Sequence, residues 1–254
     1  MASRAKWLID NRGDSLASRF DAIVFDKDGT LLDFSKTWDA AIAQAIEASA
    51  PDDRAKQDAI ASTLGFDLEE RTCLVDAPVV HRSNTELAAM LAPLTDGERL
   101  IERCGTFVLE HVTAVPSADD LLRALRDFNI AAAVATNDDE VSARAQLTAL
   151  GWWPPEERDG ARPALVQAVL ACDSGHGSKP EPGMLLAAAA ALGVRPERCA
   201  MVGDAAGDLT AARSAGFGAA ILVGAPSHVK QHARLADYWI EDVGELLLPI
   251  FGHP

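Results

Sequence analysis

The chain has 254 residues, 48% of them hydrophobic, so it can bury one large core or a core plus a sizeable insert. Its formal net charge of −15 argues against nucleic acid and membranes as partners, because binding to such polyanions depends on lysine and arginine. The same charge means that an anionic substrate would need local cations at its site.

The first 20 residues mix charged and apolar side chains, so they lack the uninterrupted apolar stretch of a signal peptide. No apolar run in the chain approaches the roughly 20 residues that span a bilayer. The four cysteines show no Cys-x-x-Cys spacing, and a chain of this length does not need disulfides to fold. We therefore expect a cytoplasmic protein, while the role of residues 1–20 and the oligomeric state stay open.

Short apolar runs that end in polar or glycine residues predict buried strands. These runs are residues 22–25, 130–135, 199–202 and 219–223. Helical patterns lie between them, at residues 118–128, 139–150, 183–192 and 209–215. Strands that alternate with helices predict an α/β fold with a parallel sheet covered on both faces.

The interval from residue 35 to residue 115 breaks this alternation. It is predicted to contain helices at residues 36–50, 52–64, 85–91 and 96–112. We expect a core formed by residues 1–34 and 116–254, with residues 35–115 inserted as a separate helical domain. Two chain crossings between the parts would let such an insert move as a lid.

Polar side chains follow the predicted strands at the edge where ligands bind in open parallel sheets. Those expected to meet there are Asp26, Asp28, Thr136, Asn137, Lys179, Asp204 and Asp208. Several carboxylates at one place repel each other unless a cation is present, and an oxygen-only ligand set suits Mg²⁺. A hydroxyl, an amide and an ammonium beside that ion would receive a phosphoryl group. By themselves, Asp204 and Asp208 could instead serve only to start a helix.

Four motifs in this order resemble the haloacid dehalogenase superfamily of phosphotransferases. The motifs are Asp26-Lys27-Asp28-Gly29-Thr30, Thr136-Asn137, Lys179, and Gly203-Asp204-Ala205-Ala206-Gly207-Asp208. Each motif alone is weak, but four in order, three of them at predicted strand ends, are specific. The resemblance covers nearly the whole chain and implies a Rossmann-like core.

The resemblance also implies a role for each matching residue. Asp26 would be the nucleophile that forms an aspartyl-phosphate, and Asp28 the acid that protonates the leaving group and later activates water. Asp26, the main-chain carbonyl of Asp28 and Asp204 would hold Mg²⁺, with Asp208 as a further or water-mediated ligand. Thr136, Asn137 and Lys179 would hold the phosphoryl oxygens.

Two positions narrow this interpretation, and a third departs from the family pattern. Asp28 argues for a phosphate substrate, because a halide leaving group needs no proton whereas an alkoxide does. Thr30 favours hydrolysis, since the phosphoglucomutases of the family commonly carry valine there. Ala205 replaces a serine found in many relatives, so a hydrogen bond that supports a metal ligand is lost.

An insert between the first and second motifs is typical of a helical cap and resembles the phosphoglycolate phosphatase group. A small phosphorylated metabolite is therefore the expected substrate, with 2-phosphoglycolate as the first candidate. One alternative is a phosphomutase, and another is a phosphonate-cleaving relative that would use a cap lysine, Lys36 or Lys56. A non-catalytic binding protein is less favoured, because such a protein would be expected to lose carboxylates that are all present here.

Overall fold

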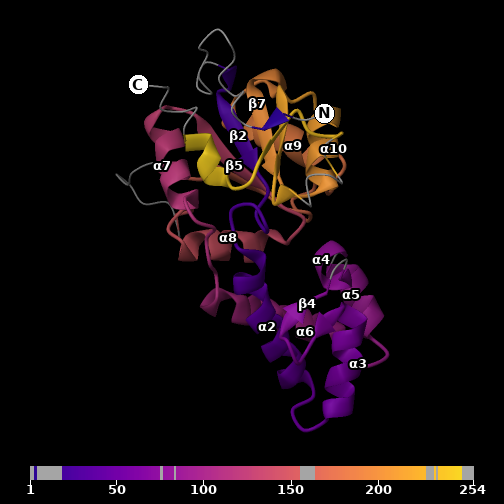
Figure 1. Ribbon diagram of the computed structural model, residues 1–254. Coiled ribbons are helices and arrows are strands. Elements are labelled where there is room, and N and C mark those ends of the chain that lie inside the picture. Colours follow the sequence, from indigo (N-terminus) through magenta and orange to yellow (C-terminus); the bar gives the residue numbers. More distant parts are fainter. Residues whose placement is uncertain are drawn as a thin grey trace. The chain divides into compact units, whose positions relative to one another are not determined.

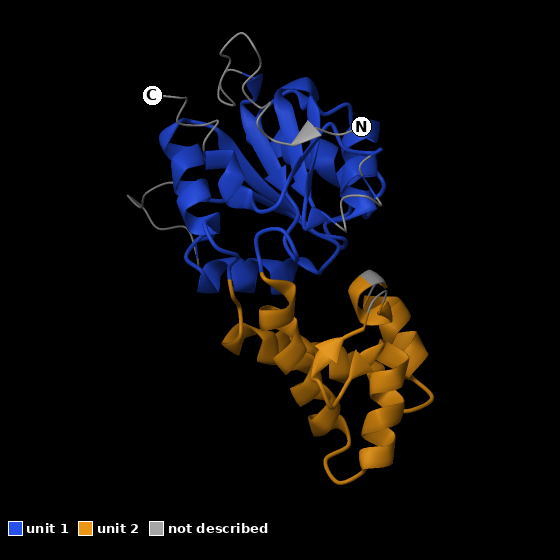
Figure 2. Ribbon diagram, viewed as in Figure 1, with its two compact units in different colours: residues 1–32, 114–254 blue, residues 33–113 orange. Residues whose placement is uncertain are grey.

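A computed structural model describes residues 3–4, 19–74, 77–82, 84–154, 164–226, 232 and 234–247. The chain divides into two compact units, one of residues 1–32 and 114–254 and the other of residues 33–113 (Figure 2). The sequence predicted an insert of residues 35–115, so both of its borders lie two residues earlier in the structure. The difference arises because Asp33 caps the first helix of the second unit, where its side chain accepts a hydrogen bond from Lys36 N.

The first unit is built on a parallel sheet of seven strands in the order β1-β9-β8-β7-β2-β5-β6 (Figure 1). The strands are β1 (Ser3–Arg4), β2 (Ala22–Phe25), β5 (Ala131–Ala135), β6 (Ala168–Leu170), β7 (Cys199–Gly203), β8 (Ala219–Val223) and β9 (Tyr238–Ile240). The interior strand β2, between β7 and β5, is apolar throughout and completely buried, as expected for a strand covered on both faces.

Helices cover both faces of this sheet, which confirms the predicted α/β class (Figure 1). The helices are α7 (Ala118–Asp127), α8 (Glu140–Ala149), α9 (Gly183–Leu192) and α10 (Ala206–Ser214), with 3-10 turns η3 (Pro196–Arg198) and η4 (Val243–Leu246). Apolar residues of α9 and α10 share one core cluster with Val24 and Met201. Ile23 and Phe25 point to the other face, because side chains alternate along a strand, and they are fully buried as well.

The second unit is mainly helical and has its own core. Its elements are α2 (Phe34–Ser49), α3 (Arg54–Leu64), β3 (Phe66–Asp67), β4 (Thr72–Cys73), α4 (Pro78–His81), α5 (Asn84–Leu91), α6 (Gly97–Phe107) and η2 (Val108–Glu110). Ile42, Ile46 and Leu64 are among the buried residues that pack between the helices. The small antiparallel hairpin of β3 and β4 was not predicted, because two-residue strands leave no alternating pattern in the sequence.

The two chain crossings between the units run side by side. Leu32 forms an antiparallel bridge with Ala114, and the N–H of Val115 donates to the carbonyl of Leu31 at 2.9 Å. On the other side of the border, the N–H of Asp33 donates to the carbonyl of Thr113 at 2.9 Å. The insert therefore leaves and re-enters the first unit at neighbouring points.

Three strands of the sheet, β1, β6 and β9, were not predicted from the sequence. They have two or three residues each, so none gives a run long enough to be separated from a loop. No helix within the described parts of the chain is long and apolar enough to cross a membrane.

Candidate active site

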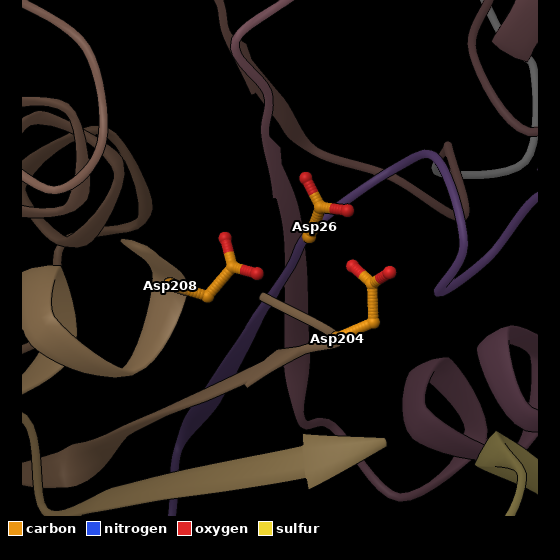
Figure 3. A group of neighbouring side chains, drawn as sticks. All are labelled: Asp26, Asp204 and Asp208. Carbon is orange, nitrogen blue, oxygen red and sulfur yellow. The ribbon is translucent and has the colours of Figure 1, made fainter. Parts of the chain in front are cut away.

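Three carboxylates meet at the carboxyl end of the sheet. Asp26 directly follows β2, Asp204 follows the neighbouring strand β7, and Asp208 lies in the first turn of α10. One carboxylate oxygen from each lies within 4.8 Å of the others, and Figure 3 shows the three side chains gathered around a common space. Adjacent parallel strands end at the same edge, which explains why distant parts of the sequence meet here.

Two glycines leave room for these carboxylates. Gly29 has a φ of +81°, a conformation that side chains rarely adopt, and a Cβ there would collide with Asp204 Oδ2. A Cβ at Gly203 would likewise collide with the carboxyl group of Asp208. Gly29 of the first motif and Gly203 of the fourth are therefore required by the close approach of the acids.

Lys179 lies between two of the acids. Its Nζ is 2.5 Å from Asp26 Oδ1 and 2.6 Å from Asp208 Oδ1. The lysine side chain is only 4% exposed, and burial alone would lower its pKa. The charges of Asp208 and Asp26 outweigh burial, so the pKa of Lys179 is raised and the side chain stays an ammonium.

Asn137 holds the main chain of Lys179 in place. Its Nδ2 donates to the carbonyl of Lys179 at 3.0 Å, and its Oδ1 accepts from the N–H of Lys179 at 2.9 Å. Thr136 is buried beside it, and its Oγ1 accepts from the N–H of Asp138 at 3.1 Å. These contacts show a positioning role for the Asn137 side chain, while the phosphoryl contacts of Thr136 and Asn137 stay predictions.

Asp208 has two functions in the structure. Its Oδ2 accepts a hydrogen bond from the N–H of Ala205 at 2.9 Å, which stabilises the start of α10, while its Oδ1 faces Lys179. The two interpretations of Asp208 left open by the sequence, a helix start and a site residue, are therefore compatible.

The electrostatics of the three acids fit a bound cation. Burial raises the pKa of Asp204 well above its ordinary value, and the nearby charges of Asp26 and Asp208 raise it further. Burial also raises the pKa of Asp26, although Lys179 opposes that shift. Three carboxylates face one ammonium, so the cluster carries excess negative charge. A divalent ion that prefers oxygen ligands, such as Mg²⁺, would relieve this repulsion.

Asp28 belongs to a second charged cluster, which sequence reasoning missed. Lys27 is completely buried, and its Nζ lies 2.5 Å from Asp28 Oδ2, 3.1 Å from Asp138 Oδ2 and 2.7 Å from Gln146 Oε1. Burial alone would lower the pKa of Lys27, but the carboxylates of Asp28 and Asp138 raise it overall. In the sequence, the signal for this cluster was a lysine inside the first motif. Gln146 lies 119 residues away in the chain, so the sequence did not show that the two residues meet.

Thr30 has a buried hydroxyl with no hydrogen-bond partner in the described part of the chain. A buried hydroxyl without a partner is unfavourable compared with an apolar group of the same shape. The sequence favours hydrolysis over phosphoryl relay at Thr30, and that expectation stays a prediction.

Comparison with known proteins identifies the family of the chain. The family model for haloacid dehalogenase-like hydrolases matches residues 20–216. The chain belongs to this family. A phosphoglycolate phosphatase from Chromobacterium violaceum is 31% identical over 235 residues, which cover 89% of this chain and 94% of that protein. A phosphoglycolate phosphatase from Xylella fastidiosa is 28% identical over 202 residues, covering 77% of this chain and 76% of that protein.

Several solved structures share the fold of the chain. CbbY from Rhodobacter sphaeroides, crystallised as a mutant with xylulose-(1,5)bisphosphate, matches with a TM-score of 0.62 and 21% identity, covering 89% of this chain and 96% of that one. A HAD phosphatase from Thermococcus onnurineus matches with a TM-score of 0.60 and 22% identity, covering 89% and 95%. The comparisons confirm the predicted family, the Rossmann-like fold and the enzyme class, a phosphatase.

Proposed function

We propose that this hydrolase is a Mg²⁺-dependent phosphatase that cleaves a small phosphate monoester through an aspartyl-phosphate on Asp26. The observation that carries the proposal is the position of Lys179, whose ammonium contacts both Asp26 and Asp208 while Asp204 completes the acidic group. An ammonium beside acidic oxygen ligands is the arrangement that a charged phosphoryl group and a divalent ion require together.

In the proposed reaction, a carboxylate oxygen of Asp26 attacks phosphorus and the ester bond breaks. Asp28 gives a proton to the departing oxygen, and then takes one from the water that hydrolyses the acyl phosphate. Lys179 donates to the phosphoryl oxygens, with Thr136 and Asn137 as further donors, and Asn137 keeps Lys179 in position through its main chain. When bound by Asp26, Asp204, Asp208 and the carbonyl of Asp28, Mg²⁺ would neutralise charge on the phosphoryl group.

The proposed substrate is a small phosphorylated metabolite. The relatives from Chromobacterium violaceum and Xylella fastidiosa, which cover most of this chain, are named phosphoglycolate phosphatases, and this makes 2-phosphoglycolate the first compound to test. The helical unit of residues 33–113 is proposed to act as the cap that selects the ester. A cytoplasmic location is part of the same proposal.

The test is hydrolysis of 4-nitrophenyl phosphate by the purified protein. Turnover should require Mg²⁺ and should fall about a thousandfold or more in Asp26→Asn, since removal of a nucleophile usually removes most catalysis. Asp21→Asn is the matched control, because Asp21 precedes β2 at the end opposite the site and is exposed. Equal turnover by the wild type and Asp26→Asn would refute the proposal.

A second measurement addresses the intermediate and the substrate. Acid-quenched protein should carry a hydroxylamine-sensitive phosphate on Asp26, located by mass spectrometry. A panel of phosphorylated metabolites, compared by kcat/KM, should then rank 2-phosphoglycolate above sugar phosphates. A panel in which a sugar phosphate is isomerised faster than it is hydrolysed would instead identify a mutase.

A further inference from the structure

Lys27 is a buried lysine that no step of the proposed reaction uses. It lies between Asp26 and Asp28 in the sequence, and its side chain has no exposed surface. An ammonium group has three hydrogens to donate, and the acceptors around it among the described residues include Asp28 Oδ2, Gln146 Oε1 and Asp138 Oδ2. The donor capacity of the group is therefore matched within the protein.

Burying an ammonium is unfavourable unless the charge is paired and hydrogen-bonded. An apolar side chain of similar length would fill the same space without that penalty. What lysine adds at this position is therefore its ion pairs, and the shorter of the two joins it to Asp28 at 2.5 Å, compared with 3.1 Å for Asp138.

The other acceptors are themselves fixed by the core. Gln146 is fully buried in α8, and its Nε2 donates to Ser142 Oγ at 2.8 Å. Asp138 lies in the segment between β5 and α8, where its N–H is bound by Thr136 Oγ1. Lys27 thus connects Asp28 to the body of the first unit, while the Asp28 side chain keeps 20% of its surface exposed.

We propose, resting on the phosphatase chemistry proposed above, that Lys27 is a positioning residue that holds the Asp28 carboxyl group where it protonates the leaving oxygen. As the bond from Asp26 to phosphorus forms, the ester bond breaks and its electron pair goes to the ester oxygen. That oxygen takes the proton of Asp28, which leaves a carboxylate facing the Lys27 ammonium. The substrates that gain most are esters of weakly acidic alcohols, because their alkoxides need this proton.

The test compares two esters that differ in the acidity of the leaving group. In Lys27→Met, kcat/KM for phenyl phosphate should fall about 100-fold, the lower end of what a positioned proton donor contributes. For 2,4-dinitrophenyl phosphate the fall should be about 5-fold or less, because dinitrophenolate leaves without a proton. Equal losses on both esters would overturn the proposal.

Arg198→Met provides the control for loss of an ion pair. Arg198 pairs with Asp21 at 2.7 Å, at the starts of β7 and β2 and thus at the far end of the same two strands. This variant should keep the wild-type ratio of activity on the two esters. A changed ratio would show that general destabilisation alters the leaving-group preference, and would overturn the proposal.

A double-mutant cycle asks whether Lys27 acts through Asp28. Asp28→Asn alone should show the same preference for the acidic leaving group. Adding Lys27→Met to Asp28→Asn should lower activity on phenyl phosphate by a further factor of only about 3, because residues that act together are not additive. Losses that multiply would mean that Lys27 acts independently, against the proposal.

Two further measurements keep the test decisive. If Lys27→Met does not fold, Gln146→Met removes one acceptor while keeping all charges, and it should shift the ester ratio in the same direction. Crystal structures of the wild type and of the variant should be compared, and the Asp28 carboxyl group should be displaced in the variant relative to the wild type. An unmoved Asp28 overturns the proposal even if no ester is cleaved, whereas absence of wild-type turnover refutes only the proposed function.

Discussion

Lys179 and Lys27 are both buried lysines that contact two carboxylates, but their surroundings differ. Lys179 faces Asp26 and Asp208 with Asp204 nearby, so three acids share one ammonium. Lys27 faces two acids and the neutral amide of Gln146. The first cluster has an excess of negative charge that a metal ion would balance, whereas the second is supplied with three acceptors for three hydrogens. Under the two proposals above, similar ion pairs would serve a reacting centre in one place and a support in the other.

The largest expected effect is a difference between the two lysine variants in which esters they still cleave. Lys179→Met should lower kcat/KM roughly 1000-fold on phenyl phosphate and on 2,4-dinitrophenyl phosphate alike, because charge on the phosphoryl group develops with either ester. Lys27→Met should affect mainly phenyl phosphate. Steady-state kinetics on both esters measure this contrast, and a Lys179→Met loss confined to phenyl phosphate would contradict it.

Metal binding is the second property in which the Lys179 and Lys27 clusters should differ. Mg²⁺ at about 100 times its Kd should raise the free energy of unfolding by about 2.7 kcal/mol, as expected for a ligand that binds only the folded protein. Asp204→Asn should remove most of this gain, since it deletes one predicted ligand.

Asp138→Asn is the matched control for metal binding, because it makes the same change of carboxylate to amide in the Lys27 cluster. Urea unfolding of each variant with Mg²⁺ and with EDTA measures the effect. If Asp138→Asn abolished the gain while Asp204→Asn kept it, the assignment of the metal to the Lys179 cluster would be wrong.

A glycine pair tests the close packing around Asp204. Gly29→Ala and Gly193→Ala both place a side chain at positive φ, which costs about 1–2 kcal/mol. Only at Gly29 would the new Cβ also collide with Asp204, whereas a Cβ at Gly193 would have no atom of the described residues within 4 Å apart from its neighbours in the chain. Gly29→Ala should therefore lose Mg²⁺-dependent turnover as well as stability, and Gly193→Ala should lose stability alone. Equal turnover in the two variants would count against the described packing.

The smallest effect is expected at Thr30, in the same loop as Lys27. Thr30→Val replaces a buried hydroxyl that has no partner in the described residues with a methyl group of the same size. The free energy of unfolding should stay the same or rise by up to about 1 kcal/mol. Thermal unfolding checks this, and a clear drop in Tm would show that the hydroxyl does have a partner.

The same variant also bears on the reaction type. Retained hydrolysis in Thr30→Val would show that Thr30 does not by itself decide between hydrolysis and phosphoryl relay.

The sequence predicts the Lys179 cluster better than the Lys27 cluster for a physical reason. Asp26 and Asp204 follow apolar runs that can be read as strands, and strand ends of a parallel sheet converge whatever the details of packing. Lys27 looks like a solvated lysine in a turn, and its burial depends on Gln146, a helix residue with no distinguishing pattern. Pairings between elements far apart in the chain are decided by tertiary packing.

The fold shows the same contrast between features that the sequence predicts and features that tertiary packing decides. The four longer strands of the sheet and the main helices were predicted because their apolar residues form runs or periodic patterns. The three-residue strands β6 and β9 were missed, since so short a segment becomes a strand only by pairing with neighbours already in place. The positioning role of Asn137 was also missed, because its partner is the main chain of Lys179 and the side chain of that residue carries no information about it.

The paired crossings at Leu32–Ala114 and Asp33–Thr113 have a consequence for how such a chain can change over time. Because the inserted segment begins and ends at adjacent points, its length and sequence can vary without moving the ends of the strands that carry the acids. Genetic exchange at these two points would join the same group of acids to a different inserted domain. The junction is therefore a natural place to build chimaeras, in which residues 33–113 are replaced as a block by the insert of a relative.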